Sequence, residues 1–204
     1  YLICDGFSGY NKLKGVIRCG CLAHMRRYWK EALPGKTRKS SDKTPAEIGL
    51  DYCNQLFELE KEYADLDADT RKAERLETEP AIWEAYWSWL ETVNPAGGSR
   101  LAKAVTYAKN QKPYMENYLL DGRCSISNNI AENIARPYAV GRKNFLFHDT
   151  VKGARASAII YSLVETAKLN NLNIYAYLET VLLYMPDYKN EPEGIEELMP
   201  WSEM

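Results

Sequence analysis

The sequence contains no long apolar run and no export signal, and its number of cysteines, five, is odd. Nowhere do about eighteen apolar residues follow one another without a charge, which is the length that a membrane-spanning helix needs. The first residues, Tyr1 to Asp5, lack the basic start of a signal peptide. Because the five cysteines occur without such a signal, we expect reduced thiols rather than disulfides. These absences predict a cytoplasmic protein with no membrane partner.

Signatures of two common enzyme classes are also missing. There is no Gly-rich phosphate loop and no Gly-x-Ser-x-Gly turn, so nucleotide hydrolysis of the P-loop type and serine hydrolysis are disfavoured. The composition that remains is that of an ordinary folded protein, with 204 residues of which 46% are hydrophobic and 26% charged. This length predicts one domain, or one and a half, with a real core.

The net charge of -2 conceals a segregation along the chain. Residues 1–45 carry ten Lys and Arg against three Asp and Glu, and residues 123–155 carry six against two. Residues 46–92 carry four against thirteen, and residues 156–204 carry two against eight. We therefore expect an anionic ligand to bind the two basic segments, residues 1–45 and 123–155.

The chain opens with two short strand patterns and then becomes helical. Residues 2–4 and 16–19 are β-branched or apolar runs joined by too few residues for a long crossover, which leaves a parallel pair open. Apolar residues at helical spacing predict helices over 22–33, 48–63, 76–90, 99–120, 154–169 and 174–185, with Ser99 as an N-cap. We expect breaks near Asp67 to Asp69 and at Pro80, a bend at Pro113, and a basic linker over 35–45.

Two acidic residues are candidates for chemistry. Asp5 follows the first strand, at the end where ligands collect in open sheets, although Asp-Gly is also an ordinary turn. Glu132 lies three residues after Asn129, the spacing of a helix capping box, and four residues before Arg136. Position alone leaves a structural and a functional role open for both.

Three further groups of residues are candidates for binding. Cys21 and His24 form a Cys-x-x-His pair, but zinc would need two more ligands and the remaining cysteines are scattered. His24, next to Arg26 and Arg27, is either a supporting residue beside an anion or an ordinary, partly buried histidine at the start of a helix. The segment 141–147 places Arg142 and Lys143 beside two phenylalanines, which suits a nucleic-acid surface and equally a basic turn before a buried strand or hairpin.

Taken in order, these motifs resemble the transposases of the bacterial insertion sequence 66 family. The resemblance rests on residues 5–11, 21–27, 128–137, 141–147 and 161–168 and on the closing Leu-Met-Pro-Trp at 198–201. It covers essentially the whole chain. One smaller departure is Asn133, where an arginine is usual in the family.

The resemblance implies a DDE recombinase with a ribonuclease H-like core, in which two aspartates and a glutamate hold two divalent metals. By this resemblance Asp5 is the second aspartate and Glu132 the glutamate, and Mg²⁺ or Mn²⁺ is the cofactor. Residues 1–45 would belong to the catalytic core, residues 46–122 would be a helical insertion, and residues 123–204 would complete the core and add C-terminal helices. The expected fold is therefore α+β, mainly helical, with a partial ribonuclease H-like core.

The same resemblance implies DNA as the partner. Arg136, Arg142, Lys143, Arg26 and Arg27 would contact its backbone. The supporting or structural residues would be Cys21, His24, Asn128 and Asn129. The family's first aspartate lies upstream of anything in this sequence, so we expect this piece by itself to be inactive, while its parent cuts and joins DNA strands.

Two other interpretations stay open at this point. The chain could be a non-catalytic helical module derived from a transposase, which binds DNA or pairs with a second copy or another protein through its Trp-rich acidic helices. Buried core is the more ordinary use of Trp83, Trp87 and Trp89. A zinc-bound regulator using Cys19, Cys21 and His24 would require stoichiometric metal.

Overall fold

The computed structural model describes residues 1–35, 42–190 and 192–202. The central part of the linker expected over 35–45 lies outside these residues. The described chain forms two compact units, Tyr1–Ile130 and Ala131–Met204, each of which is described by itself.

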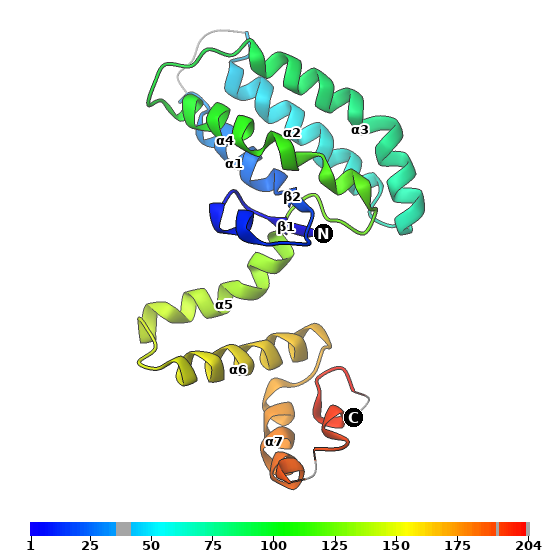
Figure 1. The fold of residues 1–204 in the computed structure, drawn as a ribbon, viewed down its shortest axis with the longest axis vertical. Coiled ribbons are helices and arrows are strands. Elements are labelled where there is room, and N and C mark those ends of the chain that lie inside the picture. Colours follow the sequence, from blue (N-terminus) through cyan, green and yellow to red (C-terminus); the bar gives the residue numbers. More distant parts are fainter. Residues whose placement is uncertain (36–41, 191, 203–204) are drawn as a thin grey trace. The chain divides into compact units, whose positions relative to one another are not determined.

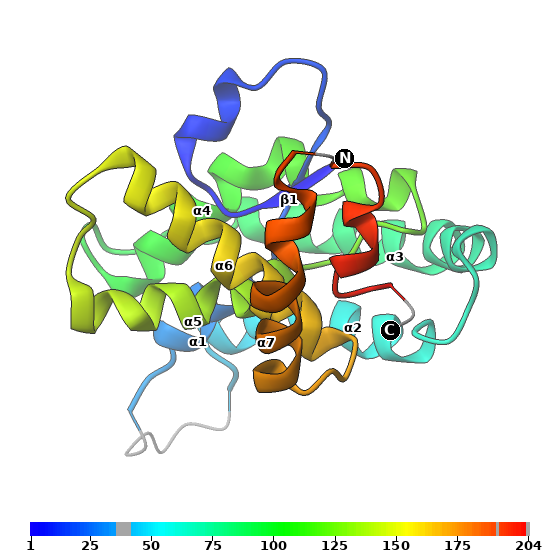
Figure 2. The ribbon, with the colours of Figure 1, turned by 90° about the horizontal axis from the view of Figure 1, so that it is seen from below.

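The first unit opens with two parallel strands, β1 (Leu2–Cys4) and β2 (Arg18–Gly20). Ile3 pairs with Cys19, and the backbone nitrogen of Leu2 donates to the carbonyl of Ile17 at 2.9 Å. The loop between the strands holds a 3₁₀-helix, Ser8–Lys12, and Figure 2 shows it in dark blue. The two strands expected from the sequence are present, the second beginning two residues later than expected, and they form the parallel pair that the sequence left open.

Four helices complete this unit, followed by a 3₁₀-helix over Asn117–Leu120 (Figure 1). They are α1 (Leu22–Glu31), α2 (Pro45–Glu62), α3 (Ala68–Glu91) and α4 (Arg100–Met115). Local capping chemistry marks the starts of α2 and α4: Thr44 and Glu47 form a capping box at α2, and the predicted cap Ser99 of α4 accepts from the backbone nitrogen of Ala102 at 3.0 Å.

Aromatic side chains from α1 and α3 form the core, where α1 packs against α2 and α4. Trp29 donates from Nε1 to the hydroxyl of Tyr86 at 3.2 Å, and its ring lies so close to α2 that a Cβ at Gly49 would be 2.5 Å away. Trp83 and Trp87 are buried, and Trp89 packs partly buried against the core. The use of these rings as core is confirmed.

Helix α3 corrects two expectations. It continues through Pro80, so the predicted break there is wrong, whereas the break near Asp67 is real because Asp67 caps α3. Leu76, the first apolar residue of the helix predicted over 76–90, is 50% exposed. The buried face instead runs through Arg75, Glu79, Trp83, Tyr86 and Leu90, and its packing outweighs the single backbone hydrogen bond that a proline removes.

The second unit is built from helices that follow the end of the first. Helix α5 (Asn129–Phe145) faces α6 (Val151–Leu169), with the rings of Tyr138 and Tyr161 5.2 Å apart, and α7 (Ile174–Tyr184) packs on α6. Two 3₁₀-helices follow, Met185–Lys189 and Ile195–Leu198. The hairpin left open around 142–147 is absent, because α5 stays helical to Phe145.

A small core holds the end of this unit together. It contains Ala167, Tyr177 and Val181, and the hydroxyl of Tyr177 donates to the carbonyl of Leu198 at 3.1 Å. Asn171, in the predicted joint between α6 and α7, adopts a φ of 57°. This left-handed conformation suits asparagine better than most residues.

The fold is mainly helical α+β, as the sequence predicts. Only two short strands occur among the described residues, so the ribonuclease H-like core stays a prediction. Within the described ranges, no helix combines the length and apolarity that crossing a membrane requires.

Candidate active site

Asp5 lies directly after β1 and is half-buried. Its Oδ1 accepts a hydrogen bond from the backbone nitrogen of Phe7 at 3.0 Å, which fixes the carboxylate in an Asx-type turn. Among the residues that the structure describes, none donates to Oδ2. The predicted turn is therefore formed, and it leaves one carboxylate oxygen available to a ligand.

The surroundings of Asp5 come from α4 and from β2. Arg18 donates to the carbonyl of Asp5 at 3.4 Å and stacks over the ring of Tyr114 at 4.1 Å. Helix α4 approaches so closely that a Cβ on Gly6 would be 3.0 Å from both Tyr107 and Gln111. A larger residue after Asp5 would therefore have to displace these two side chains.

Two buried oxygens of α4 lie in this region without a hydrogen-bond partner in the described chain, the hydroxyl of Tyr107 and Oε1 of Gln111. Burial, together with Cys21 and Asp5 nearby, raises the pKa of Tyr107 above its ordinary range. Tyr107 is therefore a neutral phenol at neutral pH, able to donate a hydrogen bond to a ligand beside Asp5.

Cys21 joins three segments that are distant in sequence. Its backbone nitrogen donates to the carbonyl of Cys4 at 3.1 Å, and its Sγ accepts from the backbone nitrogen of Asn128 at 3.5 Å. The adjacent Leu22 donates to the carbonyl of Ile126 at 3.0 Å. The end of β1, the start of α1 and the segment that leads into α5 therefore meet at this buried cysteine.

His24 lies half-buried in the first turn of α1. Its backbone nitrogen donates to the carbonyl of Cys21 at 3.2 Å, so the Cys-x-x-His pair occupies one helical turn. The described residues contain no group of three or more His, Cys, Asp or Glu side chains that could hold a metal ion.

Glu132 occupies the first turn of α5 and is exposed. The helix begins at Asn129 itself, one residue earlier than the predicted capping box requires. Arg136 and Lys143 follow Glu132 at four and eleven residues, so these three positions share one helix face, whereas Arg142 lies to its side. All three cations are exposed.

On α1, the two candidate arginines differ. Arg26 is half-buried and donates from Nε to Oδ1 of Asn54 at 2.7 Å, whereas Arg27 is exposed. Asp5, Arg26, Arg27 and Asn128 lie in the first unit, whereas Glu132 and the α5 cations lie in the second.

The donor chemistry of the two acids fits a hard divalent cation. Mg²⁺ and Mn²⁺ prefer carboxylate and carbonyl oxygens. Asp5 offers its Oδ2, with the unpartnered oxygen of Gln111 in the same region, and Glu132 offers a carboxylate on an exposed helix face. Either acid can therefore act as an oxygen ligand.

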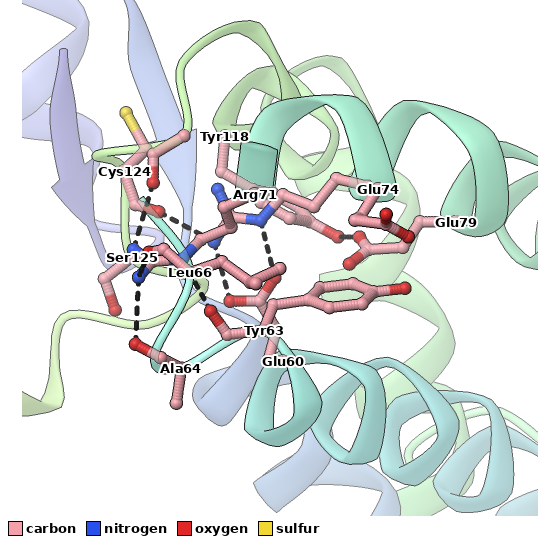
Figure 3. Close-up of polar contacts among 12 residues, drawn as sticks. Glu60, Tyr63, Ala64, Leu66, Arg71, Glu74, Glu79, Tyr118, Cys124 and Ser125 are labelled. Carbon is pink, nitrogen blue, oxygen red and sulfur yellow. Dashed lines mark hydrogen bonds and ion pairs between the residues drawn. The ribbon is translucent and has the colours of Figure 1, made fainter. Parts of the chain in front are cut away.

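A buried polar cluster that sequence reasoning missed holds the connection to α5 (Figure 3). Arg75, 1% exposed, donates from Nε and Nη2 to the two oxygens of Glu60, each at 2.6 Å, and also to the carbonyl of Cys124 at 3.0 Å. One turn earlier, Arg71 donates to the carbonyl of Gly122 at 3.2 Å. Two arginines of α3 thus hold the backbone of 122–124.

Glu79 completes this cluster. Tyr118 donates its hydroxyl to Oε2 of Glu79 and accepts from Nε1 of Trp83 at 3.1 Å. Burial raises the pKa of Glu79 to about 8. The sequence carries a weak signal of this cluster, because Arg75 and Glu79 continue the helical spacing of Trp83, Tyr86 and Leu90. Charged residues are seldom buried unless they are paired, and their partners Glu60 and Tyr118 lie far away in sequence.

Comparisons with known proteins bear on these motifs. Residues 1–156 match the family described as "Transposase IS66 family", and residues 162–201 match the "IS66 C-terminal element". Among curated proteins, the chain is 30% identical over 97% of its length to "Uncharacterized protein y4qI" and 29% identical over 89% to "Uncharacterized protein y4hP", both from Sinorhizobium fredii. The matches cover 38% and 34% of those relatives. No solved structure matches the chain.

Proposed function

Because the chain belongs to the IS66 transposase family, we propose that it forms part of the active site of a DNA transposase, which cuts and joins DNA strands by two-metal phosphoryl transfer. The observation that supports this most is the set of contacts at Cys21. They hold the strand that ends at Asp5 next to Asn128, which precedes the helix carrying Glu132. Such an enzyme would act in the cytoplasm, where bacterial DNA lies.

In this proposal Asp5 and Glu132 hold Mg²⁺ or Mn²⁺. Two such ions, when bound, stabilise the entering and leaving oxygens of a phosphodiester that is attacked in line. Asp5 is suited to this role because the turn to Phe7 engages only its Oδ1. Tyr107, which is neutral, would donate a hydrogen bond from its hydroxyl group to a ligand bound beside Asp5.

The cations would bind the DNA backbone. Arg136 and Lys143 share the face of Glu132 on α5, so a strand that reaches Glu132 would pass both of them. Arg142, Arg26 and Arg27 would add further phosphate contacts. Cys21, His24, Asn128 and Asn129 would position the two acid-bearing segments and take no part in the chemistry.

The family's third acid is not among these residues. We therefore expect the 204-residue chain by itself not to cleave DNA, and we propose that a longer protein supplies the first aspartate on a further strand of a ribonuclease H-like sheet. The chain spans less than two fifths of the curated relatives to which it is similar, which leaves room for such a segment in them.

The test is strand cleavage by a longer version of the protein that carries all three acids. Purified enzyme is incubated with DNA bearing its transposon ends and Mg²⁺, and nicked and joined products are separated on gels. Asp5→Asn and Glu132→Gln are each expected to lower the cleavage rate by about a thousandfold or more, because each removes a metal ligand. Circular dichroism melting verifies that both variants fold.

Exposed acids on α3 provide matched controls. Asp69→Asn and Glu84→Gln make the same chemical changes away from the proposed site and should leave the rate within twofold. Unchanged cleavage by Asp5→Asn or Glu132→Gln would remove that residue from the mechanism. Robust nicking by the 204-residue chain, abolished by Glu132→Gln, would overturn the expected need for the third acid.

A second candidate function is favoured by one observation in the second unit. Tyr175, Leu182 and Leu183 of α7 are each at least 65% exposed, an unusual density of large apolar side chains on one helix. A protein-interaction module would use such a surface. Concentration-dependent dimerisation in sedimentation, with no DNA binding, would favour this module over the transposase.

A further inference from the structure

A small hollow lies between α1 and α2 of the first unit, and the proposed chemistry does not use it. Its volume is about 280 Å³. It is lined by Arg26 of α1, by Asn54, Phe57, Glu58 and Lys61 of α2, and by Asn129 at the start of α5. The lining combines two cations, two amides and an aromatic ring with one carboxylate.

Arg26 is held in place at the edge of this hollow. Asn54 accepts from its Nε at 2.7 Å, and its guanidinium carbon lies 5.9 Å from the centre of the Phe57 ring. Within the described part of the chain, its two Nη groups donate to no acceptor. The arginine is therefore oriented by one bond while the groups that form bidentate contacts with phosphate stay available.

The charges of the lining favour an anion. Arg26 and Lys61 contribute two positive charges, and Glu58, which pairs with Lys61 at 2.7 Å, contributes one negative charge. Lys61 is exposed, so its flexible side chain can leave Glu58 for a phosphate at little cost. The net charge of the hollow is thus +1 around a preoriented guanidinium.

The dimensions and the ring restrict the kind of ligand. A volume near 280 Å³ lies just below the range of small-molecule sites, roughly 300–1,000 Å³, and admits about one nucleotide but no duplex. Half-buried Phe57 adds the apolar surface on which unpaired bases or sugars pack in single-strand sites, where arginine supplies the accompanying charge.

We propose that this hollow binds one unpaired nucleotide of DNA, with its phosphate on Arg26 and Lys61 and its base or sugar against Phe57. The proposal rests on the proposed function, which makes DNA the substrate, and it assigns a DNA-binding role to α2, in the region predicted to be a helical insertion. Because Asn129 lines the same hollow, the bound nucleotide would lie beside the start of the helix that carries Glu132.

The test measures binding of the 204-residue chain to fluorescein-labelled DNA by anisotropy at low salt. A 12-nucleotide single strand is compared with the duplex of the same sequence. Arg26→Gln, Phe57→Leu and Asn54→Asp are each expected to weaken single-strand binding by about fivefold or more, and to weaken duplex binding by a smaller factor. Asn54→Asp is informative because it keeps the partner of Arg26 while adding a charge that repels phosphate.

Lys109→Gln is the matched control. It removes the positive charge of an exposed ion pair between Lys109 of α4 and Glu91 of α3, outside the hollow, and should change neither affinity by more than twofold. Thermal melting of every variant verifies folding; should Arg26→Gln not fold, Phe57→Leu and Asn54→Asp decide the matter.

The outcomes separate this inference from the proposed function. The inference is overturned if Arg26→Gln, Phe57→Leu and Asn54→Asp bind the single strand as tightly as the wild type does. It is also overturned if these variants lose equal affinity for single strand and duplex, or if the wild-type chain binds no single strand. None of these results touches the cleavage test of Asp5 and Glu132. Conversely, loss of single-strand affinity in the hollow variants supports the nucleotide site even if that cleavage test fails.

Discussion

The sulfur of Cys21 accepts a hydrogen bond from the backbone nitrogen of Asn128 at 3.5 Å, across 107 residues of sequence. Through the same residue the chain reaches Cys4, whose carbonyl accepts from the Cys21 nitrogen at 3.1 Å. One buried residue thus connects the strand before Asp5, through its backbone, with the segment before Glu132, through its side chain.

Removing this sulfur should loosen the start of α5. In Cys21→Ala the Asn128 amide loses its acceptor, which costs about 1 kcal/mol of unfolding free energy beyond the loss of packing. Hydrogen exchange followed by NMR should show the Asn128 amide exchanging at least about fivefold faster. Cys53→Ala is the control, since Cys53 is equally buried in the core; faster exchange of Asn128 in that variant as well would refute the role of Cys21.

Breaking the buried ion pair of Arg75 should strongly destabilise the first unit. Arg75→Met leaves Glu60 without its two charge-assisted bonds and the Cys124 carbonyl without a donor, which costs about 3–5 kcal/mol in urea unfolding. Arg123→Gln removes an arginine from the exposed pair with Asp121 and should hardly move the unfolding midpoint. Equal unfolding midpoints for wild type and Arg75→Met would contradict the stabilising role of the Arg75–Glu60 ion pair.

Glu79 should make stability depend on pH in an unusual direction. Burial raises its pKa from 4.5 to about 8, so between these values the folded state keeps a proton that the unfolded state has lost. Its contribution to stability is therefore full below about pH 4.5 and declines as pH rises towards 8. Tyr118, Arg75 and Glu60 face this carboxyl and shift the range but not the sign.

Replacing Glu79 by glutamine tests this directly. Glu79→Gln keeps an oxygen that accepts from Tyr118, and its side chain cannot ionise. The free energy of unfolding of this variant relative to that of the wild type, measured in urea, should therefore increase from pH 5 to pH 8. Glu84→Gln, on the exposed face of α3, should track wild type throughout. A constant difference between Glu79→Gln and wild type across this range would show that Glu79 has an ordinary pKa.

The five thiols should be free and unreactive in the folded protein. All five cysteines are buried and unpaired in disulfides, and burial together with Cys124 raises the pKa of Cys19 to about 12. Because the thiolate is the reacting form, 5,5′-dithiobis(2-nitrobenzoate) should label less than one thiol per chain at pH 7.5 and five in denaturant. Fewer than five in denaturant would reveal a disulfide.

Several features were predictable because their causes are local in sequence. Ser99 caps α4 through a contact three residues away, and helical spacing of large aromatics places Trp83 and Trp87 in the core. The break at Asp67 follows from the same short-range chemistry. The motifs around Asp5 and Glu132 were likewise visible as residues, together with the family to which the chain belongs.

Other features were wrong or invisible because their causes lie elsewhere in the chain. Pro80 is tolerated within α3 because the residues around it pack on other helices, a compensation that no local rule reports. Arg75 and Glu79 look like surface residues until Glu60 and Tyr118, 15 and 39 residues away, satisfy them. Whether a charged residue can be buried depends on such partners.

The sequence by itself determined most of the helices, the cap at Ser99 and the aromatic core, because these depend on side-chain chemistry within a few turns. The tertiary structure alone decided that Cys21 joins the segments before Asp5 and Glu132, and that Arg26 is oriented beside Phe57. Both relationships join residues on different elements, and hydrogen bonds of this kind follow from packing geometry rather than from sequence spacing.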